Sequence, residues 1–298
     1  MSAAPWPAPA KINLFLHVTG RRPDGYHDIQ TLFQLIDLAD ELRIAVRRDG
    51  VIARVGGPAE VAPETDLVVM AARLLREVAG DRSLGADLAL SKRIPIGGGL
   101  GGGSSDAATA LVALNEVWGL GLGTERLAAL ARVLGADVPV FVHGTAAIGR
   151  GIGEILEPVE LAPASFAIIF PGVSVATADA FQAPELTRNS PVITISGFLL
   201  PDWPLRALPG RNDLEAVVAE RQPVVRAALE WLGRRGQARL TGSGASVFAA
   251  FRDRAAAQSA LAGLPVGWTG FVAAALGRSP LAARVAAERR AGLQSGAT

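Results

Sequence analysis

The chain has 298 residues, and its 29 basic and 28 acidic residues leave a net charge of +1. This balance argues against a charged surface for nucleic acid or an anionic membrane, and the absence of cysteine excludes disulfides, thiolate zinc sites and thiol catalysis. Gly, Pro or a charge interrupts every stretch of about 18 apolar residues, and no basic region precedes the apolar N-terminal stretch. We therefore expect a soluble, cytoplasmic protein with no nucleic-acid or membrane partner and no evident obligate protein partner.

The first half of the chain mixes predicted strands and helices. Alternating or β-rich stretches predict strands over residues 11–19, 30–38, 41–47, 86–92 and 138–142. Apolar residues at helical spacing predict helices over residues 66–79, 106–117 and 125–134. Turn chemistry at Pro23 and Gly25 separates the first two strands.

The second half follows a stretch rich in Gly and Pro, over residues 149–163, where we place a domain junction. The predicted domains are residues 1–158 and 159–298. The second contains predicted strands over residues 164–170 and 247–251, a helix over 214–232, a glycine-rich turn over 241–245 and a helix after Arg254. Strands and helices interleave without a strict βαβ rhythm, which indicates the α+β class.

Lysine is rare, because Lys11 and Lys92 are the only lysines among the 29 basic residues. Arginine is used wherever any positive charge is sufficient. Lysine has a compact ammonium group that can enter a tight site, and arginine cannot replace it there. Both lysines are therefore candidate site residues, with chance survival in an arginine-biased chain as the alternative.

The most informative stretch is the glycine loop, residues 95–105, with six glycines in seven positions followed by two serines. It lies between a predicted strand and a predicted helix. Without Cβ atoms, the backbone can approach phosphate oxygens and point successive N–H groups at them. The N-terminus of the following helix adds its free donors and partial positive charge. The loop therefore predicts phosphate binding.

Three other interpretations of the loop are weaker. A Walker A loop requires a lysine after its last glycine, and none follows Gly103. A dinucleotide fingerprint can be forced onto the glycines with Ser104 in the third place, but the acidic ribose partner about twenty residues later is missing. A flexible linker remains an alternative, although a strand and an amphipathic helix frame the loop closely.

Several motifs, in order along nearly the whole chain, resemble those of the GHMP kinases, the family of galactose, homoserine, mevalonate and phosphomevalonate kinases. They are PAKINLFL at residues 9–16, RPDGYH at 22–27, the glycine loop, GADVPVF at 135–141 and LTGSGA at 240–245. The resemblance implies two α+β domains, the first of which binds ATP, with the active site in the interdomain cleft. It also implies transfer of the γ-phosphoryl group of ATP, as its Mg²⁺ complex, to a small molecule.

The longer loop GGGLGGGSSDAA resembles one branch of the family. That branch phosphorylates the 2-hydroxyl of a methylerythritol unit attached to a cytidine diphosphate group, in non-mevalonate isoprenoid precursor synthesis. Other acceptors of the mevalonate or homoserine type remain an alternative, and so does a nucleotide-binding module without catalytic activity.

The resemblance assigns the catalytic roles to Asp137 and Lys11. Asp137 would take the proton of the attacking hydroxyl, and Lys11 beside it would keep the carboxylate ionised. Considered by residue type alone, Asp137 could instead cap a turn, and Lys11 could be a solvated lysine at a strand edge.

The resemblance also predicts the ATP-binding residues. They are Lys92, Asp66 and the loop residues Pro95, Ile96, Gly97, Gly98, Gly99, Leu100, Gly101, Gly102, Gly103, Ser104 and Ser105. Asp66 departs from the family pattern, which often has Asn there, and an ionised Asp can only accept hydrogen bonds. The ligands of Mg²⁺ are not assigned: Ser105 is a candidate, and Asp106 fits a first-turn helix acid equally well.

Four residues match acceptor-binding positions by resemblance: Asn13, Tyr26, His27 and Phe181. Aromatic faces stack on pyrimidines and an imidazole can read a polar edge, so Tyr26, His27 and Phe181 favour an acceptor that carries cytidine. The alternatives are a buried structural Asn13, an ordinary surface loop at Tyr26 and His27, and a core role for Phe181.

Overall fold

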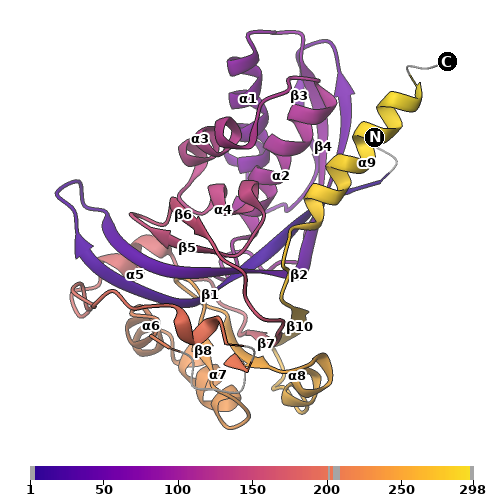
Figure 1. The fold of residues 1–298 in the computed structure, drawn as a ribbon. Helices are drawn as coiled ribbons and strands as arrows, with labels where there is room; N and C mark the ends of the chain where they lie inside the picture. The colour runs from indigo at the N-terminus through magenta and orange to yellow at the C-terminus, as the bar shows by residue number, and fades with distance from the viewer. Residues whose placement is uncertain (1–3, 201, 204–208, 296–298) are drawn as a thin grey trace.

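The computed structural model describes residues 4–295 except 201 and 204–208, and it contains two β-sheets with helices packed on them. The first sheet has the strand order β3-β4-β2-β5-β6, with β1 also paired to β2, and the second has the order β10-β7-β9-β8. The long strands β1 and β2 cross the middle of the molecule, between one group of helices and the second sheet (Figure 1). The predicted α+β class is confirmed.

The strands of the first sheet are β1 (Trp6–Arg21), β2 (His27–Arg47), β3 (Ile52–Gly56), β4 (Gly85–Ser91), β5 (Ala147–Arg150) and β6 (Ile155–Pro158). Those of the second sheet are β7 (Ser165–Phe170), β8 (Arg239–Leu240), β9 (Val247–Phe251) and β10 (Thr269–Ala274). The helices are α1 (Leu67–Ala79), α2 (Gly102–Val117), α3 (Thr124–Leu134), α4 (Val138–His143), α5 (Thr177–Gln182), α6 (Glu215–Arg221), α7 (Pro223–Gly233), α8 (Arg254–Ala260) and α9 (Pro280–Ser295).

Strand β2 is buried on both faces over residues 29–36, and its side chains there alternate between two hydrophobic clusters. Phe33 and Leu35 pack into the cluster that lies under α1–α3, whereas Leu32 and Ile36 pack into a cluster shared with the second sheet. This division follows from the two-residue period of a strand. The central strands therefore join the two halves of the chain through one continuous interior.

The last helix, α9, returns to the first half of the chain (Figure 1). Leu281 is buried in the cluster under α1–α3, and the Arg284 guanidinium lies 4.2 Å from the centre of the Trp6 ring. Arg289 forms an ion pair of 2.8 Å with Glu116 of α2. The division at residues 158 and 159 stays a prediction, because these contacts join the C-terminal end to the first half.

Four predicted elements were wrong in extent or type. The two strands over 30–38 and 41–47 form the single strand β2, and the helix over 214–232 is divided into α6 and α7, because Pro223 cannot donate to the helix that precedes it. Residues 138–142 form the helix α4 and not a strand. Pro139 favours a first helical turn, and Gly144 ends the helix at φ 71°.

No helix among the described residues is long and apolar enough to span a bilayer.

Replacement of Phe166 tests the cluster between the two sheets. Phe166 is fully buried, and its ring centre lies 6.0 Å from that of Phe248. We expect Phe166→Ala to lower the free energy of unfolding by about 3–5 kcal/mol, because it leaves a cavity at this junction. Urea denaturation measures the loss, with the exposed Val266→Ala as control, expected within about 0.5 kcal/mol of wild type. Equal small losses in both variants would contradict this packing.

Candidate active site

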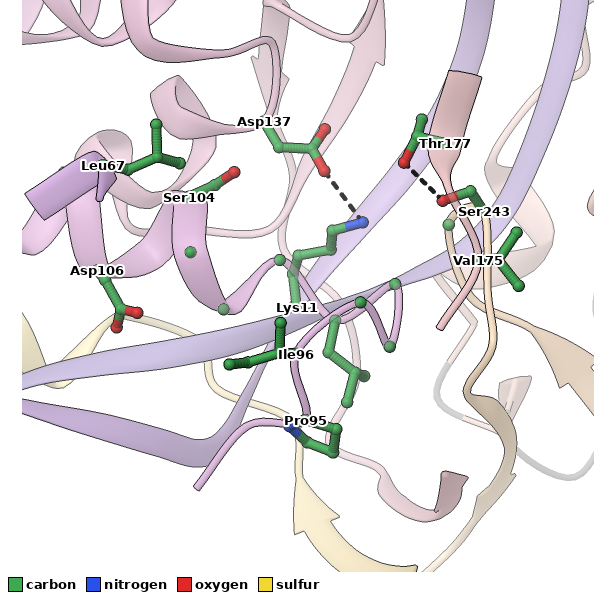
Figure 2. Close-up of a pocket in the computed structure, with 18 of the residues that line it drawn as sticks. Lys11, Leu67, Pro95, Ile96, Ser104, Asp106, Asp137, Val175, Thr177 and Ser243 are labelled. Atoms are coloured by element: carbon green, nitrogen blue, oxygen red, sulfur yellow. Dashed lines mark hydrogen bonds and ion pairs between the residues drawn. The ribbon is translucent and has the colours of Figure 1, made fainter. Parts of the chain in front are cut away.

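A cavity of about 600 Å³ lies where the two halves of the chain meet. The glycine loop and the start of α2 form one wall, and Val175, Thr177, Phe181 and residues 242–244 come from the second half. The hydroxyl groups of Thr177 and Ser243 form a hydrogen bond, with 2.9 Å between their oxygens, on the side of the cavity facing the loop (Figure 2). The cavity is therefore built by residues far apart in the sequence.

The loop turns closely enough that two of its positions require glycine. Gly99 has φ +75°, and a Cβ there would overlap the carbonyl of Thr241 from the second half. Gly101 has φ +71°, and a Cβ there would lie 2.8 Å from the ring of Phe141. An L-residue would be strained at both positions, and it would also separate the loop from its neighbours.

Helix α2 begins inside the loop, at Gly102, four residues earlier than predicted. Its first intrahelical bond runs from Ser105 N to Gly101 O, so the N–H groups of Gly102, Gly103 and Ser104 precede the hydrogen-bonded turns. These residues line the cavity. The helix therefore directs its free donors and the positive end of its dipole into the cavity, which suits an anion.

The two serines of the loop differ. Ser104 lines the cavity, whereas Ser105 is fully buried and donates its hydroxyl hydrogen to Pro9 O at 2.7 Å. Ser105 was a candidate metal ligand from the sequence, but its side chain is directed away from the cavity because it ties α2 to β1. The hydroxyl available to a ligand is that of Ser104.

Lys11 and Asp137 form an ion pair in the cavity, with 3.2 Å between Nζ and Oδ2 (Figure 2). The Lys11 side chain is only 3% exposed, whereas that of Asp137 is 35% exposed. Lys11 comes from β1, whose backbone N–H at this residue donates to Leu100 O of the loop at 3.0 Å. Asp137 precedes α4. The carboxylate is therefore accessible to a ligand and the ammonium supports it from the interior.

Asn13 lines the same cavity, but its side chain is occupied by protein groups. Its Oδ1 accepts from Lys11 Nζ at 2.5 Å, and its Nδ2 donates to Thr31 Oγ1 at 2.8 Å. Asn13 faces the same side of β1 as Lys11, as its spacing predicts. The contacts indicate that it orients the ammonium, which agrees better with the structural alternative than with a substrate contact.

Lys92 is held between two buried carboxylates, Asp40 and Asp106, with 2.6 Å between its Nζ and Asp106 Oδ2. Asp40 also accepts from the backbone N–H groups of Arg93 and Ile94. Burial raises the pKa of Asp106 to about 7; Lys92 acts against this shift and Asp40 adds to it. Burial lowers the pKa of Lys92, but the two carboxylates outweigh it, so that the pKa is raised. Asp106 Oδ1 is buried without a hydrogen-bond partner.

Asp66 lines the cavity beside Leu67 at the start of α1. Its Oδ1 accepts from Val68 N at 2.9 Å, which caps the helix, and its Oδ2 pairs with Arg54 at 2.7 Å. Both oxygens therefore have structural partners already. A contact to adenine through this side chain remains a prediction.

Of the three aromatic candidates, Phe181 lines the cavity, whereas Tyr26 and His27 do not. The Phe181 ring stacks on that of His27 with centres 5.3 Å apart. Tyr26 is 61% exposed in the turn between β1 and β2. The structure thus brings the first residue of β2 against α5 beside the cavity. That these residues bind the acceptor remains a prediction.

Sequence reasoning missed several residues around the cavity. Asp40 and Arg188 act on candidate site residues through contacts between distant segments, and Thr177 and Ser243 line the cavity itself. Ser243 lies inside the glycine-rich motif at 240–245, so that signal was present. The others lie in stretches with no motif, and only the fold reveals them.

Comparison with known proteins identifies the family of this chain. The family model of the GHMP kinases N terminal domain matches residues 66–145, and that of the GHMP kinases C terminal domain matches residues 201–265. A curated relative from Halorhodospira halophila, named 4-diphosphocytidyl-2-C-methyl-D-erythritol kinase, is 52% identical over 290 residues, which cover 96% of this chain and 98% of the relative. The chain belongs to the GHMP kinase family.

A second relative and two solved structures are also similar to this chain. A relative of the same name from Thiobacillus denitrificans is 52% identical over 276 residues, covering 93% of this chain and 96% of the relative. A crystal structure of 4-(cytidine 5'-diphospho)-2C-methyl-D-erythritol kinase superposes with a TM-score of 0.79 at 35% identity, over 90% of this chain and 98% of that one. A mevalonate kinase structure with a TM-score of 0.63 and 15% identity, over 92% of this chain and 99% of that one, shares the fold.

Within the described ranges, no group of three or more His, Cys, Asp or Glu side chains is arranged to hold a metal ion.

The raised pKa of Asp106 predicts a pH-dependent effect on stability. Because this pKa is about 7 in the folded protein and near 3.8 ordinarily, the carboxyl's contribution to stability is lost as pH rises from about 4 to 7. We expect the stability of Asp106→Asn, relative to that of wild type, to increase as the pH rises from 4 to 8. Urea denaturation without nucleotide at both pH values measures this difference.

The matched control is Asp81→Asn, for which the expected sign is opposite. Hydrogen bonds from Ser83 lower the pKa of this exposed carboxyl, so its loss should reduce stability at pH 8. An Asp106→Asn variant that gains nothing between pH 4 and pH 8 would contradict the placement of this carboxyl.

Proposed function

We propose that this protein is a kinase that transfers the γ-phosphoryl group of ATP to the 2-hydroxyl of 4-diphosphocytidyl-2-C-methyl-D-erythritol, in non-mevalonate isoprenoid precursor synthesis. The observation that carries the proposal is the Lys11–Asp137 ion pair, which lies in one cavity with the N-terminus of α2. A base for a hydroxyl and a site for phosphate are the two parts that phosphoryl transfer requires. The names of the relatives described above supply the acceptor.

The reaction assigns one task to each end of the cavity. The free N–H groups of Gly102, Gly103 and Ser104 would bind phosphate oxygens of ATP, with the dipole of α2 opposing their charge. Pro95, Ile96 and the remaining loop residues would enclose the nucleotide, and Lys92 and Asp66 lie on the same wall. The nucleotide would thus be held against the first half of the chain.

The acceptor hydroxyl would lie at Asp137. The hydroxyl oxygen of the acceptor attacks the γ-phosphorus. The bond from that phosphorus to the β–γ bridging oxygen breaks, and ADP leaves with the electron pair. The hydroxyl proton passes to the Asp137 carboxylate. Lys11 forms an ion pair with that carboxylate, and the side-chain oxygen of Asn13 holds the ammonium in place. The ion pair thus holds the Asp137 carboxylate, the proton acceptor, in a fixed position.

ATP would bind as its Mg²⁺ complex, and oxygen donors suited to this ion line the cavity. Mg²⁺ is usually held by one or two carboxylates together with substrate phosphates and water. The Ser104 hydroxyl and the unpartnered Oδ1 of Asp106 fit this description. When bound, the ion would neutralise phosphate charge.

The cytidine group of the acceptor would lie near Phe181, Tyr26 and His27. Phe181 offers a ring that faces the cavity, and the exposed Tyr26 is free to cover a base from the turn between β1 and β2. His27 stacks on Phe181 and supplies a polar edge. A small acid such as mevalonate or homoserine would use none of these groups.

A coupled assay of ADP release with a panel of acceptors tests the proposal. We expect turnover with the cytidyl acceptor and none with mevalonate, phosphomevalonate or homoserine. Turnover of one of these acids without turnover of the cytidyl compound would overturn the assignment.

Replacement of Asp137 tests the proton acceptor. Asp137→Asn keeps the shape of the side chain but removes the base, so we expect kcat to fall by at least about 10²-fold. Calorimetric affinity for ATP should change little, because the proposal assigns the phosphates to the backbone N–H groups at the start of α2 and only the acceptor hydroxyl to Asp137. Asp179→Asn, which alters an exposed carboxylate outside the cavity wall, is the control. Near-normal kcat in Asp137→Asn would mean that another group is the base.

Replacement of Tyr26 tests acceptor recognition. We expect Tyr26→Ala to raise the KM for the cytidyl acceptor about tenfold, since loss of a base–aromatic stack costs about 1–3 kcal/mol, and to leave the KM for ATP unchanged. Tyr26→Phe retains the ring and should behave like wild type. An unchanged acceptor KM in Tyr26→Ala would remove this residue from the site.

A further inference from the structure

Arg188 joins the end of α5 to the first residue of β2. Its Nη2 donates to Phe181 O at 3.0 Å and to Ala183 O at 2.7 Å, which satisfies carbonyl groups at the end of the helix. Its Nη1 donates to Leu186 O, and its Nε donates to His27 Nε2, both at 3.0 Å. One guanidinium thus positions the candidate base-recognition residues Phe181 and His27 relative to each other.

This contact determines which ring nitrogen of His27 carries the proton. A guanidinium has only donors, so Nε2 must accept with its lone pair. The neutral ring then has its hydrogen on Nδ1. Burial lowers the pKa of His27, and the charges of Arg188 and Arg21 lower it further, which favours the neutral ring. Within the described part of the chain, no hydrogen bond engages Nδ1.

The ring that carries this donor lies beside the proposed acceptor site. The His27 ring is stacked on Phe181 with an interplanar angle of 30°, and Phe181 lines the cavity. A base that lies against Phe181 would therefore bring its polar edge near His27.

We propose that Arg188 is a positioning residue that fixes His27 as a hydrogen-bond donor through Nδ1 and so selects cytosine over uracil in the acceptor. Cytosine N3 carries a lone pair, which accepts from Nδ1–H, whereas uracil N3 carries a hydrogen. With uracil, the Nδ1–H donor of His27 would face the N3–H donor of the base, and neither donor would have a hydrogen-bond acceptor. With the other tautomer, Nδ1 would accept from uracil N3–H. This inference rests on the proposed function, because it requires an acceptor with a pyrimidine base.

Kinetics with two acceptors test the inference. The cytidine compound and its uridine analogue are compared as acceptors for wild type, Arg188→Ala and Arg188→Lys. We expect wild type to favour the cytidine compound in kcat/KM by at least about tenfold, and Arg188→Ala to lose most of this preference through the acceptor KM, with the KM for ATP unchanged. Arg188→Lys, which retains a cationic donor, should recover part of it.

Arg221 provides a matched control. It also braces α5, because its Nη1 donates to Asp179 O at 3.2 Å and its Nη2 pairs with Glu185 at 3.0 Å, but its hydrogen bonds do not reach His27. Arg221→Ala should therefore retain the preference for cytidine. Loss of the preference to the same degree in both alanine variants would assign Arg188 a purely structural role and overturn the inference.

The tautomer can also be measured directly, by spectroscopy of the folded protein. Nitrogen NMR of the ring resonances resolves the three histidines, and His27→Asn assigns the signal. We expect a neutral His27 ring protonated on Nδ1 at pH 8 in wild type, and a shift toward Nε2–H in Arg188→Ala. A wild-type ring protonated on Nε2 overturns the inference whatever the kinetics show.

Different results would contradict the proposed function and the proposed role of Arg188. Wild-type enzyme that phosphorylates neither pyrimidine acceptor contradicts the proposed function. Wild-type enzyme that prefers the cytidine compound, with the same preference in Arg188→Ala, contradicts only the role of Arg188.

Discussion

The Lys11–Asp137 ion pair is the interaction on which the rest of the site depends. A buried ammonium is costly unless it is paired, and Lys11 is almost completely removed from water. Its partners are the half-buried carboxylate of Asp137 and the amide oxygen of Asn13, which Thr31 holds in turn. The interior thus supplies a fixed positive charge next to a carboxylate that a substrate can reach. A flexible arginine would not satisfy the same geometry.

The glycine loop is constrained from two sides, which explains its composition. It must expose backbone donors at the start of α2, and it must also pass close to the second half of the chain. Gly99 approaches the carbonyl of Thr241, and Gly101 approaches Phe141 and the stem of Lys11. Phosphate binding, contact between the two halves and the position of the lysine are therefore linked in one segment. Substitution there would disturb all three.

Much of this molecule could be predicted from its sequence where the signal is local. The helical period of α1 and the turn before β9 are such signals, and the loop motif located the cavity wall. The continuity of β2 and the helix at residues 138–143 were missed because packing on both faces and Pro139 outweighed local propensity. Asp40 and Arg188 could not be predicted, because they contact Lys92 and His27 across 52 and 161 positions of the chain. No spacing rule encodes such contacts.

The most direct test of the account is a crystal structure with a non-hydrolysable ATP analogue and the cytidyl acceptor bound together. We expect the γ-phosphate at the N-terminus of α2 and the acceptor 2-hydroxyl within about 2.6–3.2 Å of the Asp137 carboxylate, in line with the γ-phosphorus. An acceptor hydroxyl held by a different base, or phosphates bound away from the glycine loop, would contradict it.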